Sequence, residues 1–400
     1  MDAQARRFIR SWVICCLFFT AAIAAFNWIM DPYMLIDVRR IPGLNARKPA
    51  VDTQQYLMKA YDVLRLKPRT LILGSSRVGI GMDAQSRMWP QEDRPVYNLG
   101  LAQGGPYEAY RYLQHATARD PVRLVLVGLE FQHFVVDEQD STTDFEPRLV
   151  TTKEGAENSG AAREHIRDVL LGVLSLGALI DSASTLEGNL SSTSSDLTAG
   201  YWKFDTFRRS EVGGSAYPFF AAPDREFSRW YVNRPLDPRA LSYVRSILDF
   251  CAAHAIRVIL LLSPSHADEL EVFDLAGAWN RFEDWKRDLV TLTAEYARTG
   301  ARVELWDFCG YDRYSTESVP SDRESLHWFL NPNHFTRALG NVMVGRIFGA
   351  EDHDFGEMLT PENIESHLAA IREQRRQYRE RSPDEAQRVR VAFASAMNDR

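Results

Sequence analysis

Two short segments, far apart along the chain, carry the residues that could do chemistry. The first is 71–77, an apolar run that ends in Gly-Ser-Ser-Arg, and the second is 331–335, which contains His334. Serine is a weak nucleophile until a base takes its proton, and a neutral histidine within hydrogen-bond reach supplies that base. A fold that joins Ser76, or its neighbour Ser75, to His334 would have the groups for ester chemistry. Hydroxyl residues at strand ends are also ordinary turn formers, and this alternative stays open.

The pattern between residues 70 and 350 predicts a mostly parallel sheet covered by helices, because apolar strands alternate with helical segments. In such sheets the loops that follow the strands gather at one edge, where sites form. We therefore expect Ser76 and the loops after the other strands to line one pocket. The expected strands are 70–73, 96–97, 122–127, 257–262 and 303–306, and the expected helices are 56–66, 107–118, 162–179, 238–254, 282–298 and 336–348.

An apolar stretch near the N-terminus predicts a membrane anchor. Arg6, Arg7 and Arg10 precede a run that stays mostly apolar to Met30, close to the roughly 20 residues that a helix needs to cross a bilayer. Basic residues before the span predict a single pass through the inner (cytoplasmic) membrane, with the following domain on the periplasmic side. A signal peptide cleaved at 22–24, Ala-Ile-Ala, is the alternative. The anchor is favoured because the apolar run continues past these alanines.

Composition divides the chain into four parts: an anchor at 1–31, a juxtamembrane connector at 32–69, an α/β domain at 70–350 and a charged helical tail at 351–400, broken at Pro383. The section 137–237 interrupts the alternation and predicts an inserted cap over the carboxyl ends of the strands. We expect the tail to form a solvated helix, because arginines and glutamates alternate along it.

Composition also excludes several classes of function. A formal net charge of −7 gives no reason to expect nucleic-acid binding. Four cysteines are too few for a disulfide framework, and buried free thiols at Cys251 and Cys309 are favoured over a bond between them. HExxH, Cys-x-x-Cys and P-loop patterns are missing from the sequence, so neither a metal nor a cofactor is predicted.

Three segments resemble blocks of the SGNH (GDSL-type) hydrolases. Residues 71–77 resemble the first block, with Gly-Ser-Ser in place of Gly-Asp-Ser; 98–105, Asn-Leu-Gly-Leu-Ala-Gln-Gly-Gly, resemble the second; and 331–334, Asn-Pro-Asn-His, resemble the last. The resemblance implies a three-layer, flavodoxin-like SGNH fold. The layout is similar to membrane-anchored, SGNH-like proteins that modify bacterial envelope polysaccharides, some of which transfer acyl groups rather than hydrolyse them.

The resemblance also implies roles for particular residues. Ser76 matches the nucleophile and His334 the base. The second block gives a glycine N–H to the oxyanion hole, and Gly104 is the nearest match, with Gly100 or Gly105 as alternatives.

Two departures from the family pattern affect the expected chemistry. Asn331 occupies the acid position of the last block, and an asparagine can hold an imidazole without stabilising imidazolium charge. The third block normally gives an asparagine to the oxyanion hole, but the third strand is followed by Gly-Leu-Glu-Phe at 128–131; Asn98 or Gln103 could replace it. The carboxylates in the right region to replace the missing acid are Asp307, Asp312, Asp322 and Glu324.

Two further residues are candidates for binding substrate. Arg77 could bind an anionic sugar or a carboxylate, and His266 follows the strongest predicted strand. A structural salt bridge at Arg77 and a satisfied histidine at position 266 are the alternatives.

Two hypotheses of function follow. The first is an exported, membrane-anchored serine esterase or O-acyltransferase that acts on acyl groups of an envelope or secreted polysaccharide. The second is a catalytically degenerate SGNH-like protein that binds glycan or a membrane acyltransferase partner.

Overall fold

The computed structural model describes residues 3–135, 143–191, 196–198, 200–203, 229–320, 326–349 and 354–398. The chain divides into two compact units. The anchor unit consists of residues 1–65, 144–198 and 202–205, and the sheet unit consists of 66–143, 199–201 and 206–400.

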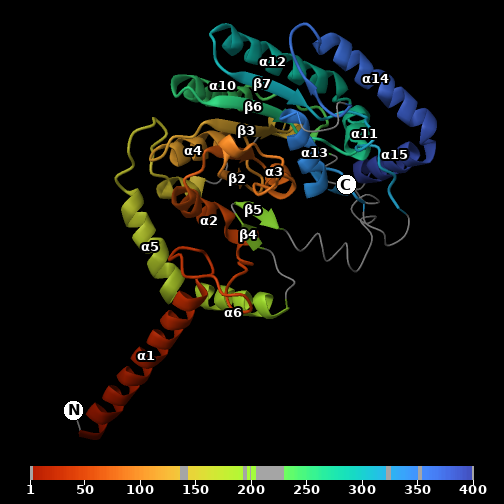
Figure 1. The fold of residues 1–400 in the computed structure, drawn as a ribbon. Helices are drawn as coiled ribbons and strands as arrows, with labels where there is room; N and C mark the ends of the chain where they lie inside the picture. Colours follow the sequence, from red (N-terminus) through yellow and green to blue (C-terminus); the bar gives the residue numbers. More distant parts are fainter. Residues whose placement is uncertain are drawn as a thin grey trace. The chain divides into compact units, whose positions relative to one another are not determined.

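A six-stranded sheet forms the centre of the sheet unit (Figure 1). Five strands run parallel in the order β2-β1-β3-β6-β7, and the short β10 pairs antiparallel with β7. The parallel part has the 2-1-3-4-5 order of doubly wound sheets, in which the switch point lies between the first and third strands. The predicted α/β class with a mostly parallel sheet is confirmed, and the antiparallel edge strand was not predicted. The strands are β1 (Thr70–Gly74), β2 (Val96–Gly100), β3 (Leu124–Leu129), β6 (Arg257–Leu262), β7 (Val303–Asp307) and β10 (Glu357–Met358).

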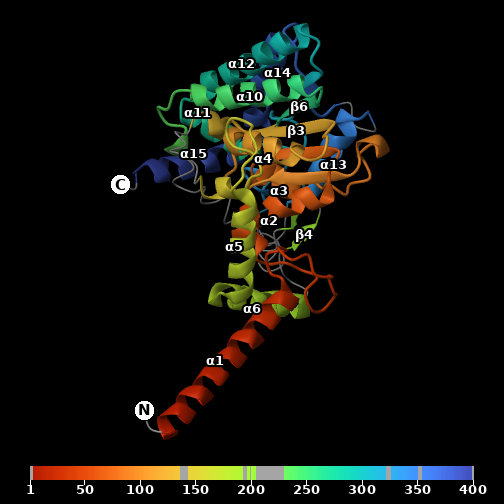
Figure 2. The same ribbon diagram turned by 90° about the vertical axis from the view of Figure 1, so that its left-hand side faces the viewer.

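Helices cover both faces of this sheet (Figures 1 and 2). On one face, side chains of the strands such as Ile72, Leu126 and Ile259 share a buried core with α3 and α13. Of the other helices, α4 contacts β1 and β2, α10 contacts β6 and α12 contacts β7. The helices are α3 (Ser76–Gly81), α4 (Pro106–Thr117), α10 (Pro238–Ala253), α11 (Ala267–Leu275), α12 (Trp279–Arg298) and α13 (Arg337–Ile347), with short 3₁₀ helices at Gln91–Asp93 and Phe131–Phe134. A separate hairpin of β8 (Phe329–Asn331) and β9 (His334–Phe335) carries His334.

The anchor unit contains a helix long and apolar enough to cross a membrane. α1 (Ala3–Met30) includes this candidate span at Gln4–Met30, judged by length and composition. The described residues of the predicted cap are divided between the two units: 144–198 belongs to the anchor unit, and 229–237 belongs to the sheet unit. Leu66, Thr143 and Tyr201 belong to the sheet unit. With those three residues excepted, the other anchor-unit elements are α2 (Val51–Leu66), η3 (Thr143–Arg148), α5 (Ala161–Leu174), α6 (Leu176–Ser191) and the small paired strands β4 (Asp196–Thr198) and β5 (Tyr201–Lys203).

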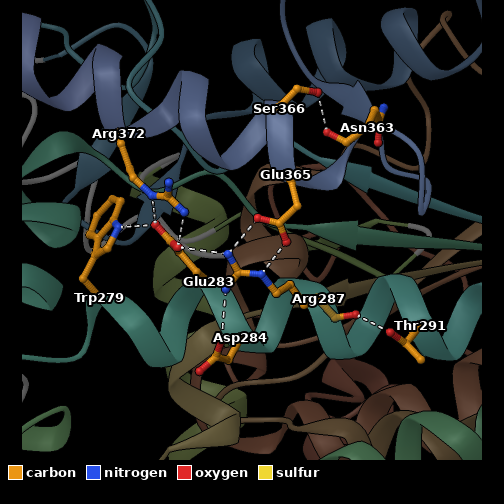
Figure 3. Close-up of polar contacts among 9 residues, drawn as sticks. All are labelled: Trp279, Glu283, Asp284, Arg287, Thr291, Asn363, Glu365, Ser366 and Arg372. Atoms are coloured by element: carbon orange, nitrogen blue, oxygen red, sulfur yellow. Dashed lines mark hydrogen bonds and ion pairs between the residues drawn. The ribbon is translucent and has the colours of Figure 1, made fainter.

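The C-terminal tail packs on the sheet unit, contrary to the solvated helix expected from its charges. It forms α14 (Ile364–Arg381) and α15 (Pro383–Asn398), so the break at Pro383 lies where it was predicted. Figure 3 shows the reason for the packing: Arg372 of α14 donates to Glu283 of α12 at 2.7 Å, and Arg287 of α12 donates to Glu365 of α14 at 2.7 Å. Arg372, Arg375 and Arg379 thus pair with carboxylates outside the tail, whereas Arg376 pairs with glutamates of α14 itself. Apolar residues buried along α14 complete the contact: Ile364, Leu368, Ile371 and Tyr378.

Candidate active site

The turn between β1 and α3 sets the position of the candidate nucleophile. Gly74 has φ +137, which a residue with a side chain rarely adopts, and a Cβ there would meet the Gly128 carbonyl oxygen at 2.8 Å. Ser75 is buried and caps α3, because its Oγ accepts the Arg77 N–H at 3.1 Å. Ser76 is the first residue of α3 and is only half-buried. The Ser75 hydroxyl therefore has a structural partner, and the Ser76 hydroxyl lies at the carboxyl edge of the sheet.

Ser76, His334 and Asn331 form a chain of hydrogen bonds. Ser76 Oγ lies 2.8 Å from His334 Nε2, and His334 Nδ1 lies 3.0 Å from Asn331 Oδ1. Ser76 and His334 are separated by 258 positions in the sequence. The fold thus brings together the two segments, 71–77 and 331–335, whose residues could carry out ester chemistry.

The contacts of Asn331 determine which nitrogen of His334 carries the proton. Asn331 Oδ1 also accepts the backbone N–H groups of Asn333, at 3.1 Å, and of His334, at 2.8 Å. Because backbone N–H groups can only donate, the atom that faces them must be the amide oxygen. His334 Nδ1 must then donate to that oxygen, which leaves Nε2 with a lone pair directed at the Ser76 hydroxyl. This is the tautomer that a general base requires.

Close packing holds the His334 hairpin against α3. A Cβ on Gly81 would meet the Phe335 ring at 2.1 Å, and a Cβ on Gly340 of α13 would meet the Gly81 carbonyl oxygen at 2.0 Å. The backbone N–H of His266 also donates to the Pro332 carbonyl at 2.9 Å. Two glycines and one backbone hydrogen bond therefore fix the distance between Ser76 and its histidine.

The surroundings of His334 keep its imidazole neutral. Loss of solvation disfavours the imidazolium ion, and the positive charge of Arg77 acts in the same direction, so the pKa of His334 is lowered to about 3. The carboxylate of Glu130 opposes this shift without overcoming it. The imidazole is therefore in the neutral form that a general base requires.

The lowered pKa predicts an unusual pH profile for ester cleavage. We expect the acid limb of kcat/KM to lie nearer pH 3 than the ordinary histidine value of 6.5, because the base is lost only when His334 is protonated. Since the unfolded chain binds a proton between these values and the folded chain does not, the free energy of unfolding should also fall as pH drops from 6.5 towards 3. Initial rates with p-nitrophenyl acetate across this range would measure the limb.

The control for this profile is Asn331→Asp. A carboxylate beside Nδ1 favours imidazolium, so the acid limb of the variant should move to higher pH than in the unaltered protein. An acid limb near pH 6.5 in the unaltered protein would contradict the lowered pKa of His334, and a limb that Asn331→Asp leaves in place would contradict the assignment of His334 as the base.

The residues expected in the oxyanion hole are engaged elsewhere. Asn98 lies inside β2 rather than in a loop, and its amide donates to the carbonyls of Val78, at 2.8 Å, and Met82, at 2.7 Å, so no amide hydrogen is left for a ligand. The Gly104 N–H donates to the Leu101 carbonyl at 3.0 Å. The alternatives are similarly occupied: the Gly100 N–H by Asn98 Oδ1, at 2.8 Å, and the Gly105 N–H by Glu108, at 2.9 Å. Gln103 is exposed in the same turn, with φ +57.

Arg77 and His266 make structural contacts rather than facing an open site. Arg77 is buried and forms an ion pair with Glu269 at 2.6 Å, so the salt-bridge alternative describes its observed contacts. His266 is also buried: its Nδ1 accepts the Asp268 N–H as the cap of α11, and its Nε2 lies 2.7 Å from the Glu317 carbonyl. Both ring nitrogens of His266 have partners, which leaves neither for a substrate.

The proposed replacement carboxylates have other partners where the structure describes them. Asp307 is buried against Lys286, at 2.6 Å, and His367, at 2.8 Å. Asp312 accepts the N–H groups of two following residues in a turn, the nearer at 2.7 Å. Asp322 and Glu324 lie outside the described residues. The two ring nitrogens of His334 have hydrogen-bond partners in Ser76 and Asn331.

One charged residue of the site was missed by the sequence analysis. Glu130 is the first residue after β3 and is buried; it accepts a hydrogen bond from Ser263 Oγ at 3.0 Å, and its other oxygen lies 3.0 Å from His133 Nδ1 as an ion pair. Burial alone would raise its pKa, but the contact with His133 and the charge of Arg77 lower it, so Glu130 is ionised. A polar residue directly after a buried strand on the carboxyl edge was the available signal.

Comparison of the sequence with models of known protein families finds no match. Comparison with curated proteins also finds none.

Proposed function

We propose that this protein is an exported, membrane-anchored serine esterase or O-acyltransferase of the SGNH type, acting on acyl esters of an envelope or secreted polysaccharide. The observation that carries the proposal is the hydrogen-bonded chain from Ser76 through His334 to Asn331, with the protons in the order that nucleophilic catalysis needs. Its position after β1, beside the switch point of the sheet, supports the same reading.

The reaction begins with transfer of the Ser76 hydroxyl proton to His334 Nε2 as Oγ attacks the acyl carbonyl carbon. The tetrahedral intermediate collapses, the bond to the alcohol oxygen breaks, and the Nε2 proton passes to that leaving oxygen. Water or a sugar hydroxyl then attacks the acyl-enzyme, His334 takes its proton, and Ser76 Oγ leaves and recovers that proton. Water as the acceptor gives hydrolysis, and a sugar hydroxyl gives transfer.

The imidazolium formed in each step has an amide rather than a carboxylate beside Nδ1. Asn331 supplies orientation, and the nearby charge that favours imidazolium is that of Glu130. For the oxyanion, the Ser76 N–H is available in the first turn of α3, where no preceding helical carbonyl accepts it. The Gly104 N–H would join it only if its hydrogen bond to Leu101 opened.

Covalent labelling tests the proposal directly. The full-length protein in detergent would be treated with a fluorophosphonate serine probe, and the modified peptide identified by mass spectrometry. We expect one adduct, on Ser76, and none on Ser76→Ala. Ser75→Ala, which removes only the cap of α3, is the matched control and should still be labelled.

The second candidate, a degenerate protein that binds glycan or an acyltransferase partner, is favoured by one observation. The N–H groups of Gly100, Gly104 and Gly105 are all engaged, so an oxyanion hole of two donors is not preformed. Absence of labelling in a folded protein, or labelling that Ser76→Ala does not change, would reject the enzyme and leave this candidate.

A further inference from the structure

The two helices α5 and α6 of the anchor unit expose an unusually apolar outer surface. The two helices meet at a bend of 66°. On α6, the exposed fractions of Leu176, Ile180 and Leu190 are 69%, 68% and 71%. The last two turns of α5 carry exposed leucines as well. These are Leu170, Leu171 and Leu174, and each is about half exposed.

The opposite side of α6 is polar, and it is the side that is buried. Asn189 exchanges hydrogen bonds with the backbone of Arg47, accepting at 2.9 Å and donating at 3.0 Å. Asp181 accepts the Tyr33 hydroxyl proton at 2.6 Å, and Ser182 and Thr185 are fully buried. A helix on a water-facing surface has the reverse arrangement, with its apolar stripe inward. The inverted pattern indicates that the outer surface of α6 faces something other than water.

The bend between α5 and α6 is attached to the end of the candidate membrane span. Asn27 of α1 donates to the carbonyls of Val173, at 3.0 Å, and Ser175, at 3.4 Å, on either side of that bend. Buried Lys48 closes the end of α1 by donating to the carbonyls of Met30 and Asp31 at 2.8 and 2.9 Å. Figures 1 and 2 both show this corner at the C-terminal end of α1.

The length of the span places this corner near the membrane surface. Twenty-seven helical residues extend about 40 Å, whereas the hydrocarbon core of a bilayer is about 30 Å thick. If α1 crosses the membrane, its last turns, where Asn27 lies, therefore reach the headgroup region.

We propose that α6 and the end of α5 lie in the interfacial layer of the same bilayer that α1 crosses, as a second, non-spanning membrane contact. The attachment of this corner to the end of α1, the candidate membrane span, identifies the bilayer as the occupant. Glu187 lies on the same face of α6 as Ile180, seven positions apart, and a carboxylate there is compatible with headgroup depth but not with the hydrocarbon centre. Arg163 and Arg167 are exposed nearer the N-terminus of α5, where they are placed to meet lipid phosphates.

Spin labels on the full-length protein test this placement. In a Cys15→Ser, Cys16→Ser background, Leu176→Cys and Ile180→Cys would be labelled singly and the protein reconstituted in vesicles of phosphatidylcholine and phosphatidylglycerol. Ala162→Cys, exposed in the first turn of α5, is the matched control. We expect the ratio of collisions with oxygen to collisions with a water-soluble nickel chelate to be several-fold higher at 176 and 180 than at 162.

Three results would overturn the proposal, each pointing to a different occupant. Equal nickel accessibility at all three sites would mean that the surface faces water in a lipid-only system, which leaves a partner protein to cover it. A depth at the bilayer centre would mean that α5 and α6 enter the membrane as a broken span. Dipolar broadening between labels would mean that a second copy of the chain covers the face.

Discussion

His334→Ala is expected to lower the turnover of p-nitrophenyl acetate by roughly 10⁴-fold, because general-base catalysis by a positioned histidine contributes up to about that factor. The Ser76 hydroxyl, 2.8 Å from Nε2, would lose the group that accepts its proton. The variant should remain folded, since the hairpin is held by the packing of Phe335 and by backbone hydrogen bonds that the substitution leaves in place. Initial rates at pH 7 would measure the turnover, and circular dichroism would measure whether the variant is folded.

The matched control is His254→Ala. His254 is exposed at the end of α10. Its removal should leave the rate unchanged, which separates loss of the base from a general effect of losing a histidine. A fall of less than tenfold for His334→Ala would contradict the proposed role, because solvent would then be an adequate base.

Asn331→Ala separates orientation from proton transfer. This variant keeps the base but removes the oxygen that fixes its tautomer, so the rate should fall by less than in His334→Ala. Formamide or acetate added to the assay should not restore the rate of this variant. A free molecule would have to replace all three hydrogen bonds that Asn331 Oδ1 accepts. The same rate in both variants would mean that His334 cannot work without its asparagine.

More of the chemistry of the site than of its supporting contacts could be predicted from the sequence. Ser76 follows an apolar run and His334 precedes a helix, so local residue types made both residues candidates. Their roles as nucleophile and base came from the resemblance of their segments to SGNH blocks. The alternation of strands and helices similarly predicted the sheet. Whether Ser75 caps α3 depends on where its side chain points in the turn. The spacing of residue types along the sequence does not indicate that direction.

Contacts made across the fold were the ones that the sequence could not supply. Asn98 was expected in a loop, but pairing with β1 extends β2 through Gly100 and directs the amide at the carbonyls of α3. Glu130 was passed over because Ser263, which donates to it, is 133 positions away in the sequence. The tail arginines looked solvated because the carboxylates that pair with them are about a hundred residues away, as with Arg379 and Glu271.

Lys286→Met is expected to lower the free energy of unfolding of the sheet unit by about 3–5 kcal/mol, the usual cost of leaving a buried charge without its partner. Lys286 is fully buried and donates to Asp307 at 2.6 Å and to the Cys309 carbonyl at 2.8 Å. Burial alone would raise the pKa of Asp307, but the charges of Lys286 and His367 hold that pKa at about 2. Methionine fills the space of the lysine stem but leaves that carboxylate with one cation fewer.

Hydrogen exchange on the peptide that covers β7 would measure this loss, since the two units need not unfold together. At 1.4 kcal/mol per factor of ten, the expected change is an exchange rate about 10²–10⁴-fold faster. Lys67→Met is the matched control: its ion pair with Asp120 is 3.4 Å long and largely exposed, so its loss should cost under about 1 kcal/mol. Lys286→Met/Asp307→Leu should recover part of the loss, because it removes the stranded charge itself. Equal, small effects for both lysines would show that the buried pair contributes no more than a surface one.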